Sequence, residues 1–505
     1  MPIDNNIEEL YNITNEKITL LNAIFYKYYF STLNNEYNKE NERVMKDRLL
    51  IFKRKCNAIY NAPAKIIVFS FLLVVLIGGL LLSLPISSNN GMSTGFFNSL
   101  FTAVSATCVT GLSFFDTYTQ WSLFGQFVIL ALIQIGGLGV VTISIFFYVV
   151  AGKKLGLRGM HLAKESINVS ETEGLNDLFK FIVRMTFCVE FIGAIILSLV
   201  FVKDYGFLKG SYISIFLAIS SFCNAGFDVL GFRGPFTGLT EYNNNPIVIY
   251  TVGCLIILGS LGFIVWYDVF HNNKKRKFLF HTKVVLIMTS ILVFFGAVIF
   301  FIMEYDNELT FKNLSLCEKI NAAFFQSITL RTAGFSSVDV SKLRQSTKAL
   351  ASIIMFVGGA PGSTSGGIKV TTLAVLIMTV ICNIQNKPDT MMFKHKVDKK
   401  IVYRSISMFF MSIVVVLVGT GILYYSTLYN ESLNIIDFMF ETISAFSTVG
   451  LSVGVTAQVN VVGAIALMVM MFMGRVGPIS LLLSVATKNN DVSYKIYPEG
   501  RIMVT

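Results

Sequence analysis

The chain has 505 residues, of which 54% are hydrophobic and 14% are charged, whereas soluble domains carry about 25% charged residues. This composition argues against an ordinary soluble enzyme, and the 45 Phe and 20 Tyr argue against a disordered chain, because they must bury apolar surface. The formal net charge of +11 could suggest a nucleic-acid partner, but the positions of the charges indicate a membrane protein instead.

Residues 1–62 are polar and rich in Asn, and they end in the basic run Lys53-Arg54-Lys55. We interpret them as a partly helical cytoplasmic N-terminal extension. A disordered tail lying near anionic lipid headgroups is an equally good interpretation.

Eight apolar segments follow, each at least as long as the roughly 20 residues that a helix needs to cross a bilayer. They lie near 64–84, 121–151, 178–203, 246–270, 281–303, 349–382, 402–427 and 459–486. A shorter apolar stretch lies between the two members of each pair, near 95–113, 211–228, 320–336 and 435–452. The sequence therefore predicts an all-α membrane protein with eight transmembrane helices, in which a transmembrane helix, a re-entrant pore loop and a second transmembrane helix occur four times.

Basic residues are concentrated in alternate connecting segments. Of the 41 Lys and Arg, 30 fall in the segments 1–65, 152–184, 271–283, 383–404 and 488–505. By the positive-inside rule these segments are cytoplasmic. We therefore expect a multi-pass protein of the cell membrane with both termini in the cytoplasm, in contact with the lipid bilayer and not with nucleic acid.

Each re-entrant stretch ends in a short segment that contains a glycine. The four glycines are separated by 115, 108 and 116 residues. The segments are Val109, Thr110 and Gly111; Asn224, Ala225 and Gly226; Thr332, Ala333 and Gly334; and Thr448, Val449 and Gly450. Four glycines at nearly constant spacing, each after a stretch rich in Ser, Thr and Ala, indicate a fourfold internal repeat.

Four such segments can surround one axis and offer the same backbone carbonyls. Rings of carbonyl oxygens replace the hydration shell of a monovalent cation, and glycine permits backbone torsions that other residues avoid. Irregular backbone at membrane depth must be buried in protein or line a water-filled path. The pattern therefore predicts a water-accessible pseudo-fourfold pore, with a filter for a monovalent cation made of backbone carbonyls.

A second glycine cluster follows each of these segments. For Gly136 to Gly139 and Gly259 to Gly262 we accept close helix packing. The third cluster cannot be a continuous helix, because Pro and consecutive Gly break the hydrogen-bond ladder, and we interpret it as an intramembrane gate. Its residues are Gly358, Gly359, Ala360, Pro361, Gly362, Ser363, Thr364, Ser365, Gly366 and Gly367.

Several ionisable residues lie within apolar stretches. Arg475, in the fourth cluster, is expected to contact carbonyls or hydroxyls of the 358–367 loop and to help close the pore, since a buried arginine is costly without such a role. Arg331 is expected to point away from the axis and brace a loop. Glu441 is placed at the front of the fourth short helix, and Glu190 has no evident partner.

These features resemble the ion-translocating subunits of the Trk/Ktr/HKT superfamily of K+ transporters, and most closely the bacterial Ktr type. The most specific part is the run from Gly358 to Lys369, which looks like the gating loop of that family, together with Arg475. The resemblance covers about 64–487 and implies nothing about the extension. The expected domains are the cytoplasmic N-terminal extension 1–62, repeats 63–151, 178–270, 281–382 and 401–487, and a cytoplasmic tail 488–505.

The resemblance implies K+ uptake across the cytoplasmic membrane by a channel-like, non-enzymatic subunit without a cofactor of its own. It also implies a homodimer docked on a cytosolic ring of nucleotide-binding, RCK-type regulatory subunits, with 271–283 and 383–404 as plausible contacts. In this family a glycine at the first filter position accompanies K+ preference, so Gly111 favours K+. Na+ remains a candidate as a coupled or activating ion.

Two other function classes are weaker. An alternating-access symporter would have two related halves with broken helices in matching positions, whereas the sequence suggests four repeats and one long break. A membrane enzyme would need paired carboxylates or a His/Asp cluster, and the four His are scattered at 161, 271, 281 and 395.

Overall fold

The structure is a computed structural model that describes residues 63–139, 142, 175–271, 278–427 and 433–477. The predicted extension 1–62 and tail 488–505 lie outside these residues. So do 140–141 and 143–151 of the first predicted repeat, 478–487 of the fourth, and 272–277 of one predicted basic segment.

Four long helices carry the clearest membrane signature. They are α3 (Pro63–Ser83), α9 (Leu175–Tyr205), α13 (Phe280–Glu304) and α17 (Lys399–Ser426), and each is long and apolar enough to cross a bilayer. Large apolar side chains on them are open to the outside, among them Phe191, Phe295 and Leu417, each more than 60% exposed. An apolar surface of this kind suits lipid and not water, so the protein is an all-α membrane protein, as expected.

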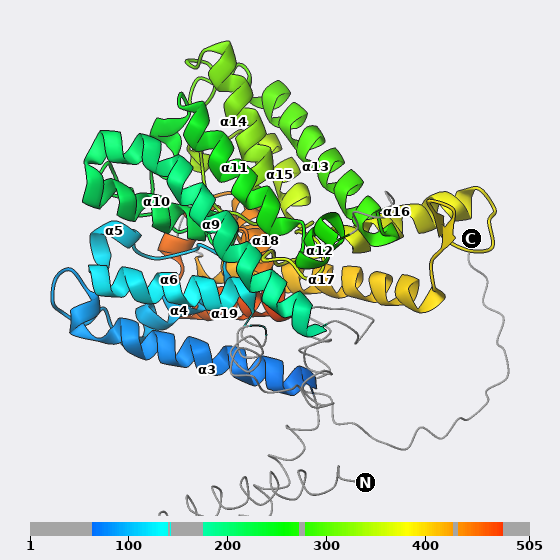
Figure 1. Cartoon of the computed structure of the whole chain (residues 1–505), viewed down its shortest axis with the longest axis horizontal. Coiled ribbons are helices and arrows are strands. Elements are labelled where there is room, and N and C mark those ends of the chain that lie inside the picture. The colour runs from blue at the N-terminus through cyan, green and yellow to red at the C-terminus, as the bar shows by residue number, and fades with distance from the viewer. Residues whose placement is uncertain (1–62, 140–141, 143–174, 272–277, 428–432, 478–505) are drawn as a thin grey trace, which may run out of the picture. The chain divides into compact units, whose positions relative to one another are not determined.

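Each long helix is followed by a short helix of 12 to 16 residues that packs against it. These short helices are α4 (Phe96–Cys108), α10 (Phe207–Phe222), α14 (Leu316–Thr329) and α18 (Ile435–Phe446). Figure 1 shows α3 beside α4 and α9 beside α10. At 1.5 Å per residue they are too short to cross the bilayer, in agreement with the re-entrant helices expected from the sequence.

The helices that follow are also short. They are α6 (Leu123–Leu138), α11 (Pro246–Ser260), α15 (Gln345–Met355) and α19 (Val461–Val476). After a break, α11 continues as α12 (Phe263–His271) at an angle of 94°, and α15 is followed by α16 (Val370–Ile384). By length and composition the described part therefore contains four spans, or five if α11 and α12 form one broken span. The eight predicted spans stay a prediction.

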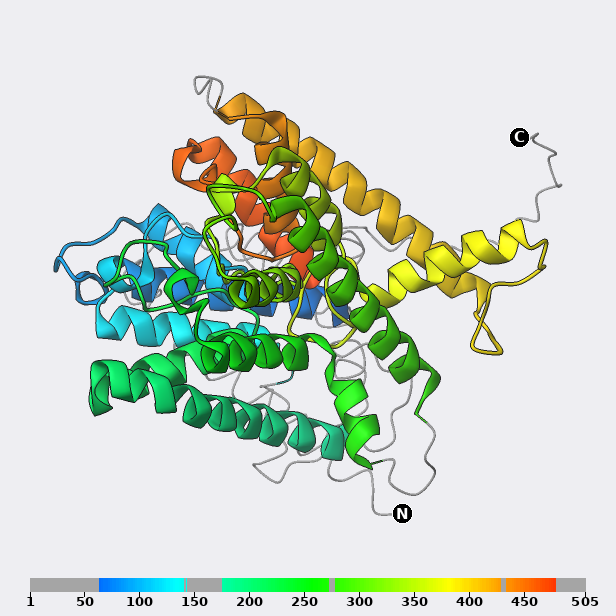
Figure 2. The same cartoon turned by 90° about the horizontal axis from the view of Figure 1, so that it is seen from above.

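Short elements connect the helices. They are η1 (Pro85–Ser87), α5 (Thr117–Gln120), η2 (Thr240–Tyr242), η3 (Val340–Lys342), η4 (Thr456–Gln458) and the strands β1 (Met391–Met392) and β2 (His395–Lys396). The strands pair antiparallel around Phe393 and Lys394, which both have positive φ as a tight hairpin turn requires. The predicted basic segment 383–404 thus comprises the end of α16, this hairpin and the start of α17, which project together to one side in Figure 2.

A buried ion pair joins α15 to α18, the short helices that lie in the groups begun by α13 and α17. Lys348 of α15 lies 2.8 Å from Asp437 of α18, and both side chains are about 95% buried, with exposed fractions of 6% and 5%. Asp437 also accepts a hydrogen bond from the backbone N–H of Asn434, as part of the capping box that begins α18. The carboxylate therefore fixes both the start of a short helix and its neighbour.

Replacing Lys348 with Met should lower the free energy of unfolding by about 3–5 kcal/mol, because it leaves the Asp437 carboxylate buried without its counter-charge. The matched control is Lys342→Met, which removes an exposed pair with Asp339 and should change stability by less than about 1 kcal/mol. Denaturant unfolding of the purified protein in mixed micelles measures both. Equal changes in the free energy of unfolding would mean that the buried pair contributes no more to stability than the exposed pair.

Candidate functional site

The four glycine segments (109–111, 224–226, 332–334 and 448–450) share one unusual backbone conformation. In each, the first residue and the glycine have positive φ, with a residue of negative φ between them. The first residues are Val109 at 59°, Asn224 at 61°, Thr332 at 66° and Thr448 at 55°; the glycines are Gly111 at 94°, Gly226 at 69°, Gly334 at 78° and Gly450 at 91°. Left-handed torsions are costly for β-branched residues, so their recurrence marks a functional geometry.

The left-handed residues make each segment irregular, because a regular strand has negative φ throughout and turns successive groups to opposite sides. Each glycine segment can therefore turn carbonyls in directions that a regular strand does not allow.

The four glycines meet in a closed ring. A Cβ atom built on Gly111 would lie 2.6 Å from the Ala225 carbonyl oxygen, and one on Gly226 would lie 2.8 Å from that of Ala333. One on Gly334 would lie 2.6 Å from the Val449 oxygen, and one on Gly450 would overlap the Thr110 oxygen. Each glycine thus touches the next segment, and the fourth touches the first. A side chain fits at none of these positions.

Hydroxyl groups of the short helices hold the ring in place. Ser105 Oγ accepts a hydrogen bond of 3.0 Å from the Gly111 N–H, and Ser444 Oγ accepts one of 3.1 Å from the Gly450 N–H. In the other two segments Ser220 and Thr329 donate at 2.6 Å to the carbonyls of Phe227 and Phe335. Sequence reasoning missed these roles, although a Ser six residues before the glycine in three segments was a usable signal.

The acidic residues near the segments have partners in the protein. Glu441 is fully buried and accepts hydrogen bonds from Ser452 Oγ at 2.6 Å and from the N–H groups of Val453 and Thr456 at 3.1 Å. It lies in the middle of α18, so its expected place at the front of the helix was wrong, and Asp437 occupies that place. Glu441 instead stabilises the chain that leaves the fourth glycine segment.

Glu190, for which the sequence suggested no partner, is paired across two helices. Gln134 Nε2 donates to its Oε1 at 3.1 Å, and Cys223 Sγ, just before the second glycine segment, lies 3.8 Å from the same oxygen. The carboxyl is almost completely buried. These contacts connect α6, α9 and the end of α10.

Backbone hydrogen bonds join the two ends of the loop 358–367 to each other and join the loop to the break between α11 and α12. The Gly358 N–H donates to Ile368 O at 2.8 Å, and the Val370 N–H donates to Gly359 O at 3.1 Å. Three further backbone bonds join the loop to the α11–α12 break, from Ala360 N to Ser260 O, from Thr364 N to Gly259 O and from Phe263 N to Gly362 O. The loop therefore has a defined conformation in this structure.

The loop packs directly on three of the four glycine segments. Asn224 Nδ2 donates to Ser365 Oγ at 2.9 Å. A Cβ atom on Gly366 would overlap the hydroxyl of Thr448, and one on Gly358 would lie 3.4 Å from the Thr332 methyl group. All three contacts involve the first residue of a segment. The loop therefore covers one end of the ring.

The side chains of Arg475 and Lys369 both bind carbonyls of the loop. Arg475, in the last turn of α19, donates from Nη1 to Thr364 O and from Nη2 to Gly136 O and, at 3.0 Å, to Gly137 O. Lys369 Nζ donates to Ser365 O at 2.6 Å. Arg475 therefore bridges the loop and the end of α6, and the contact with the loop is the one that the sequence suggested.

Arg331 contacts the start of the same loop. Its side chain is 1% exposed, and Nη2 donates to Gly358 O at 3.3 Å. Nε and Nη1 have no hydrogen-bond partner among the described residues. Arg331 thus braces the 358–367 loop, in the bracing role expected for it.

The other glycine clusters are also helix ends, which corrects part of the sequence interpretation. α6 ends at Leu138 before Gly139, α11 ends at Ser260 before Gly262, and α19 ends at Val476 before Gly477, and these three glycines all have positive φ. Close packing is present too, because a Cβ atom on Gly136 or Gly259 would overlap the carbonyl of Thr107 or Phe222. The short break between α11 and α12, with its bend of 94°, was therefore missed, whereas the long break at 358–367 is present as expected.

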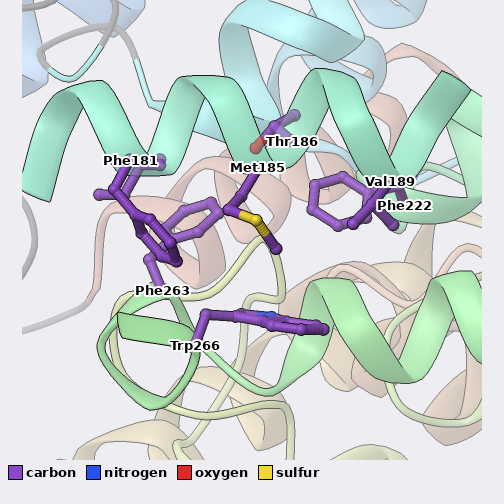
Figure 3. Close-up of a pocket in the computed structure, with 8 residues that line it drawn as sticks. Phe181, Met185, Thr186, Val189, Phe222, Phe263 and Trp266 are labelled. Carbon is purple, nitrogen blue, oxygen red and sulfur yellow. The ribbon is translucent and has the colours of Figure 1, made fainter. Parts of the chain in front are cut away.

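A small apolar pocket lies at the bend between α11 and α12. Figure 3 shows Met185 and Thr186 of α9 on one side and Trp266 of α12 on the other. Its lining is Phe181, Ile182, Met185, Thr186, Val189, Phe222, Phe263 and Trp266. This lining has no ionisable group, and within the described ranges no cluster of three or more His, Cys, Asp or Glu could hold a metal.

Comparisons with known proteins agree on one family. The family model TrkH, described as a cation transport protein, matches residues 47–495. The chain is 38% identical to the potassium/sodium uptake protein NtpJ of Enterococcus hirae over 88% of this chain and 97% of that one. It is 36% identical to the Ktr system potassium uptake protein B of Bacillus subtilis, over 87% and 96%.

A solved structure has the same fold. The potassium transporter TrkH from Vibrio parahaemolyticus matches with a TM-score of 0.62 at 16% identity, covering 82% of this chain and 84% of that chain. At this identity the match is evidence for the fold alone.

Proposed function

The chain belongs to the TrkH family of cation transport proteins, which are transporters and not enzymes, and from this premise we propose that it is the ion-translocating subunit of a Ktr/Trk-type K+ uptake system. Relatives that match this chain over nearly their whole length are named as potassium or potassium/sodium uptake proteins. The observation that carries the proposal is the closed ring of Gly111, Gly226, Gly334 and Gly450.

In this proposal the four glycine segments form the selectivity filter. Their carbonyls replace the hydration shell of K+ at the centre of the ring. The repeated left-handed torsions support this role, because they give all four segments the same irregular backbone. The four groups of helices then correspond to four repeats around a pseudo-fourfold pore, with eight transmembrane helices in all.

Replacing Gly111 with Ser should lower the preference for K+ over Na+. A Cβ atom there would lie 2.6 Å from the Ala225 oxygen, so the serine must displace a carbonyl of the next segment. This displacement changes the ring of carbonyl oxygens that favours K+. We expect the K+/Na+ permeability ratio to fall about tenfold, which corresponds to about 1.4 kcal/mol. Competition by Na+ in rubidium uptake measures this, and unchanged selectivity would remove the first segment from the filter.

The loop 358–367 and Arg475 form the proposed gate. The loop packs against Asn224, Thr332 and Thr448 at one end of the proposed filter. A K+ ion that leaves the filter at this end meets the loop and the guanidinium that holds it. Displacement of the loop therefore opens the path, and a cytosolic regulatory subunit controls that displacement.

Membrane potential supplies the driving force. One charge that crosses the membrane gains about 2.3 kcal/mol per 100 mV, so accumulation needs no nucleotide hydrolysis by this chain. Na+ is the candidate second ion, as a coupled or activating species. The protein works in the cytoplasmic membrane with both termini inside, as a homodimer on a ring of nucleotide-binding subunits that contact the basic segments 271–283 and 383–404.

Alternating access is the second candidate, and one observation favours it. The break between α11 and α12 occurs in addition to the one between α15 and α16, so broken helices occur in two groups, as that mechanism expects. The closed ring argues for the pore, because four equivalent contacts around one centre have no role in a site between two moving halves.

Reconstitution tests the proposed function. The purified full chain in liposomes under opposing K+ and Na+ gradients should give a reversal potential close to that of K+, with flux saturating only at high concentration. A reversal potential that follows a fixed K+:Na+ ratio would favour the symporter, and an absence of K+ flux would refute the proposal.

A further inference from the structure

Asn224 differs from the residues at the matching positions of the other three glycine segments. These are Val109, Thr332 and Thr448, with the same left-handed backbone. Asn tolerates this conformation better than β-branched residues, and its amide supplies two donors. Asn224 uses them to join two other parts of the site.

The first donor contact is with the loop 358–367. Asn224 Nδ2 lies 2.9 Å from Ser365 Oγ, and Asn224 and Ser365 are 0% and 2% exposed. By contrast, Thr448 Oγ1 has no hydrogen-bond partner in the part of the chain that is described. The hydroxyl at the matching position of the fourth segment therefore makes no such bond.

The second contact is with the third glycine segment. Asn224 Nδ2 also lies 3.2 Å from the Arg331 carbonyl, and the Arg331 side chain donates to Gly358 O at the start of the loop. One amide thus connects the second segment to the loop at Ser365 and to Arg331, the residue before the third segment, whose own side chain binds the start of the loop. The bridge joins groups that are 107 and 141 residues away in the chain.

The side chain has little freedom to adopt another position. A Cβ atom on Gly259 would lie 2.9 Å from Asn224 Oδ1 and 2.9 Å from Thr364 Oγ1, so α11 closes the space on one side. In a dry environment a buried donor that loses its partner costs more free energy than the bond contributes when it is made. Displacement of the loop must therefore move Asn224 or leave its amide unpaired.

We infer that Asn224 couples the loop 358–367 to the filter, so that the position of the loop changes the ion selectivity of the ring. The inference rests on the proposed function and extends it. Because Asn224 is itself a filter residue, a movement of its side chain shifts the backbone carbonyls of the second segment. By linkage the coupling is reciprocal, and ion occupancy of the filter also biases the loop.

The test uses a substitution in the loop and measures a property of the filter. In the full chain in liposomes, Ser365→Ala should lower the K+/Na+ permeability ratio by about threefold or more, the effect of one ordinary hydrogen bond. Ser352→Ala is the matched control, because its buried hydroxyl lies outside the loop and the ring and bonds within α15, to Lys348 O at 2.8 Å. The control should leave the ratio unchanged.

A second variant keeps the inference testable if Ser365→Ala fails to fold. Asn224→Thr places at this position the residue found in the third and fourth segments, and it should lower the ratio to a similar extent. In the double variant the K+/Na+ permeability ratio should fall by the same factor as in each single variant, and not by the product of the two factors, because both substitutions remove the same contact.

The possible outcomes separate this inference from the function on which it rests. Suppose that the unmodified protein carries K+ but the K+/Na+ permeability ratio is unchanged in Ser365→Ala and Asn224→Thr. The coupling would then be overturned, while the proposed pore would stand. Higher total flux in Ser365→Ala at constant ratio would also overturn it, since the contact would then hold the loop alone. An absence of K+ flux in the unmodified protein would refute the proposed function.

Discussion

Replacing Gly450 with Ala should abolish K+ uptake. The residue has a φ of 91°, and a Cβ atom on it would overlap the Thr110 oxygen that closes the ring. Backbone strain of about 1–3 kcal/mol adds to the displacement of a carbonyl that is proposed to coordinate K+. At about 1.4 kcal/mol per factor of ten, a loss on the order of 100-fold is expected. Uptake by potassium-depleted cells that lack other K+ transporters measures it.

Gly454 offers a matched control four residues further along. Its φ is 95°, almost the same as that of Gly450, but no atom lies within 4 Å of the position that a Cβ atom would take. Gly454→Ala therefore introduces the backbone strain without the overlap, and it should retain most of the uptake. If both variants lose uptake equally at normal membrane levels, strain explains the effect and the ring contact does not.

The ring itself could be predicted from the sequence, because its signal repeats. Gly111, Gly226, Gly334 and Gly450 follow similar apolar stretches at nearly constant spacing. Each stretch forms a short helix in the structure, and the four glycines are in contact. A shared local pattern was sufficient here, since equivalent segments of one chain tend to adopt equivalent places around an axis.

The torsions before each glycine could not be predicted. Val109, Thr332 and Thr448 are β-branched and prefer extended backbone, yet all three are left-handed. The tertiary contacts of the ring override this local preference. Conformational propensities assigned to single residues do not include such tertiary contacts.

The helix breaks at Gly139 and Gly262 were missed for a different reason. Glycine clusters in apolar segments indicate close packing and helix ends equally well. Both are present here, because the same clusters pack against the carbonyls of Thr107 and Phe222. The partner of Glu190 was missed because Gln134 lies 56 residues away, on another helix.

Replacing Arg475 with Ala should increase K+ flux in the absence of a regulatory partner. The guanidinium joins the loop at Thr364 O to α6 at Gly136 O and Gly137 O. A hydrogen bond to a charged group contributes about 1.5–3 kcal/mol, so its loss should raise the open fraction by about tenfold or more. Rubidium efflux from liposomes measures the flux, and a lower flux from normally folded protein would contradict the gate.

Arg475→Lys distinguishes two ways in which the arginine can close the path. If its positive charge repels K+, lysine should keep the flux low, because the charge remains. If its fork of donors holds the loop, lysine should raise the flux almost as much as alanine, since an ammonium on a flexible stem cannot reproduce the planar, pre-organised fork. The structure favours the second outcome, because the guanidinium spans carbonyls of two different elements.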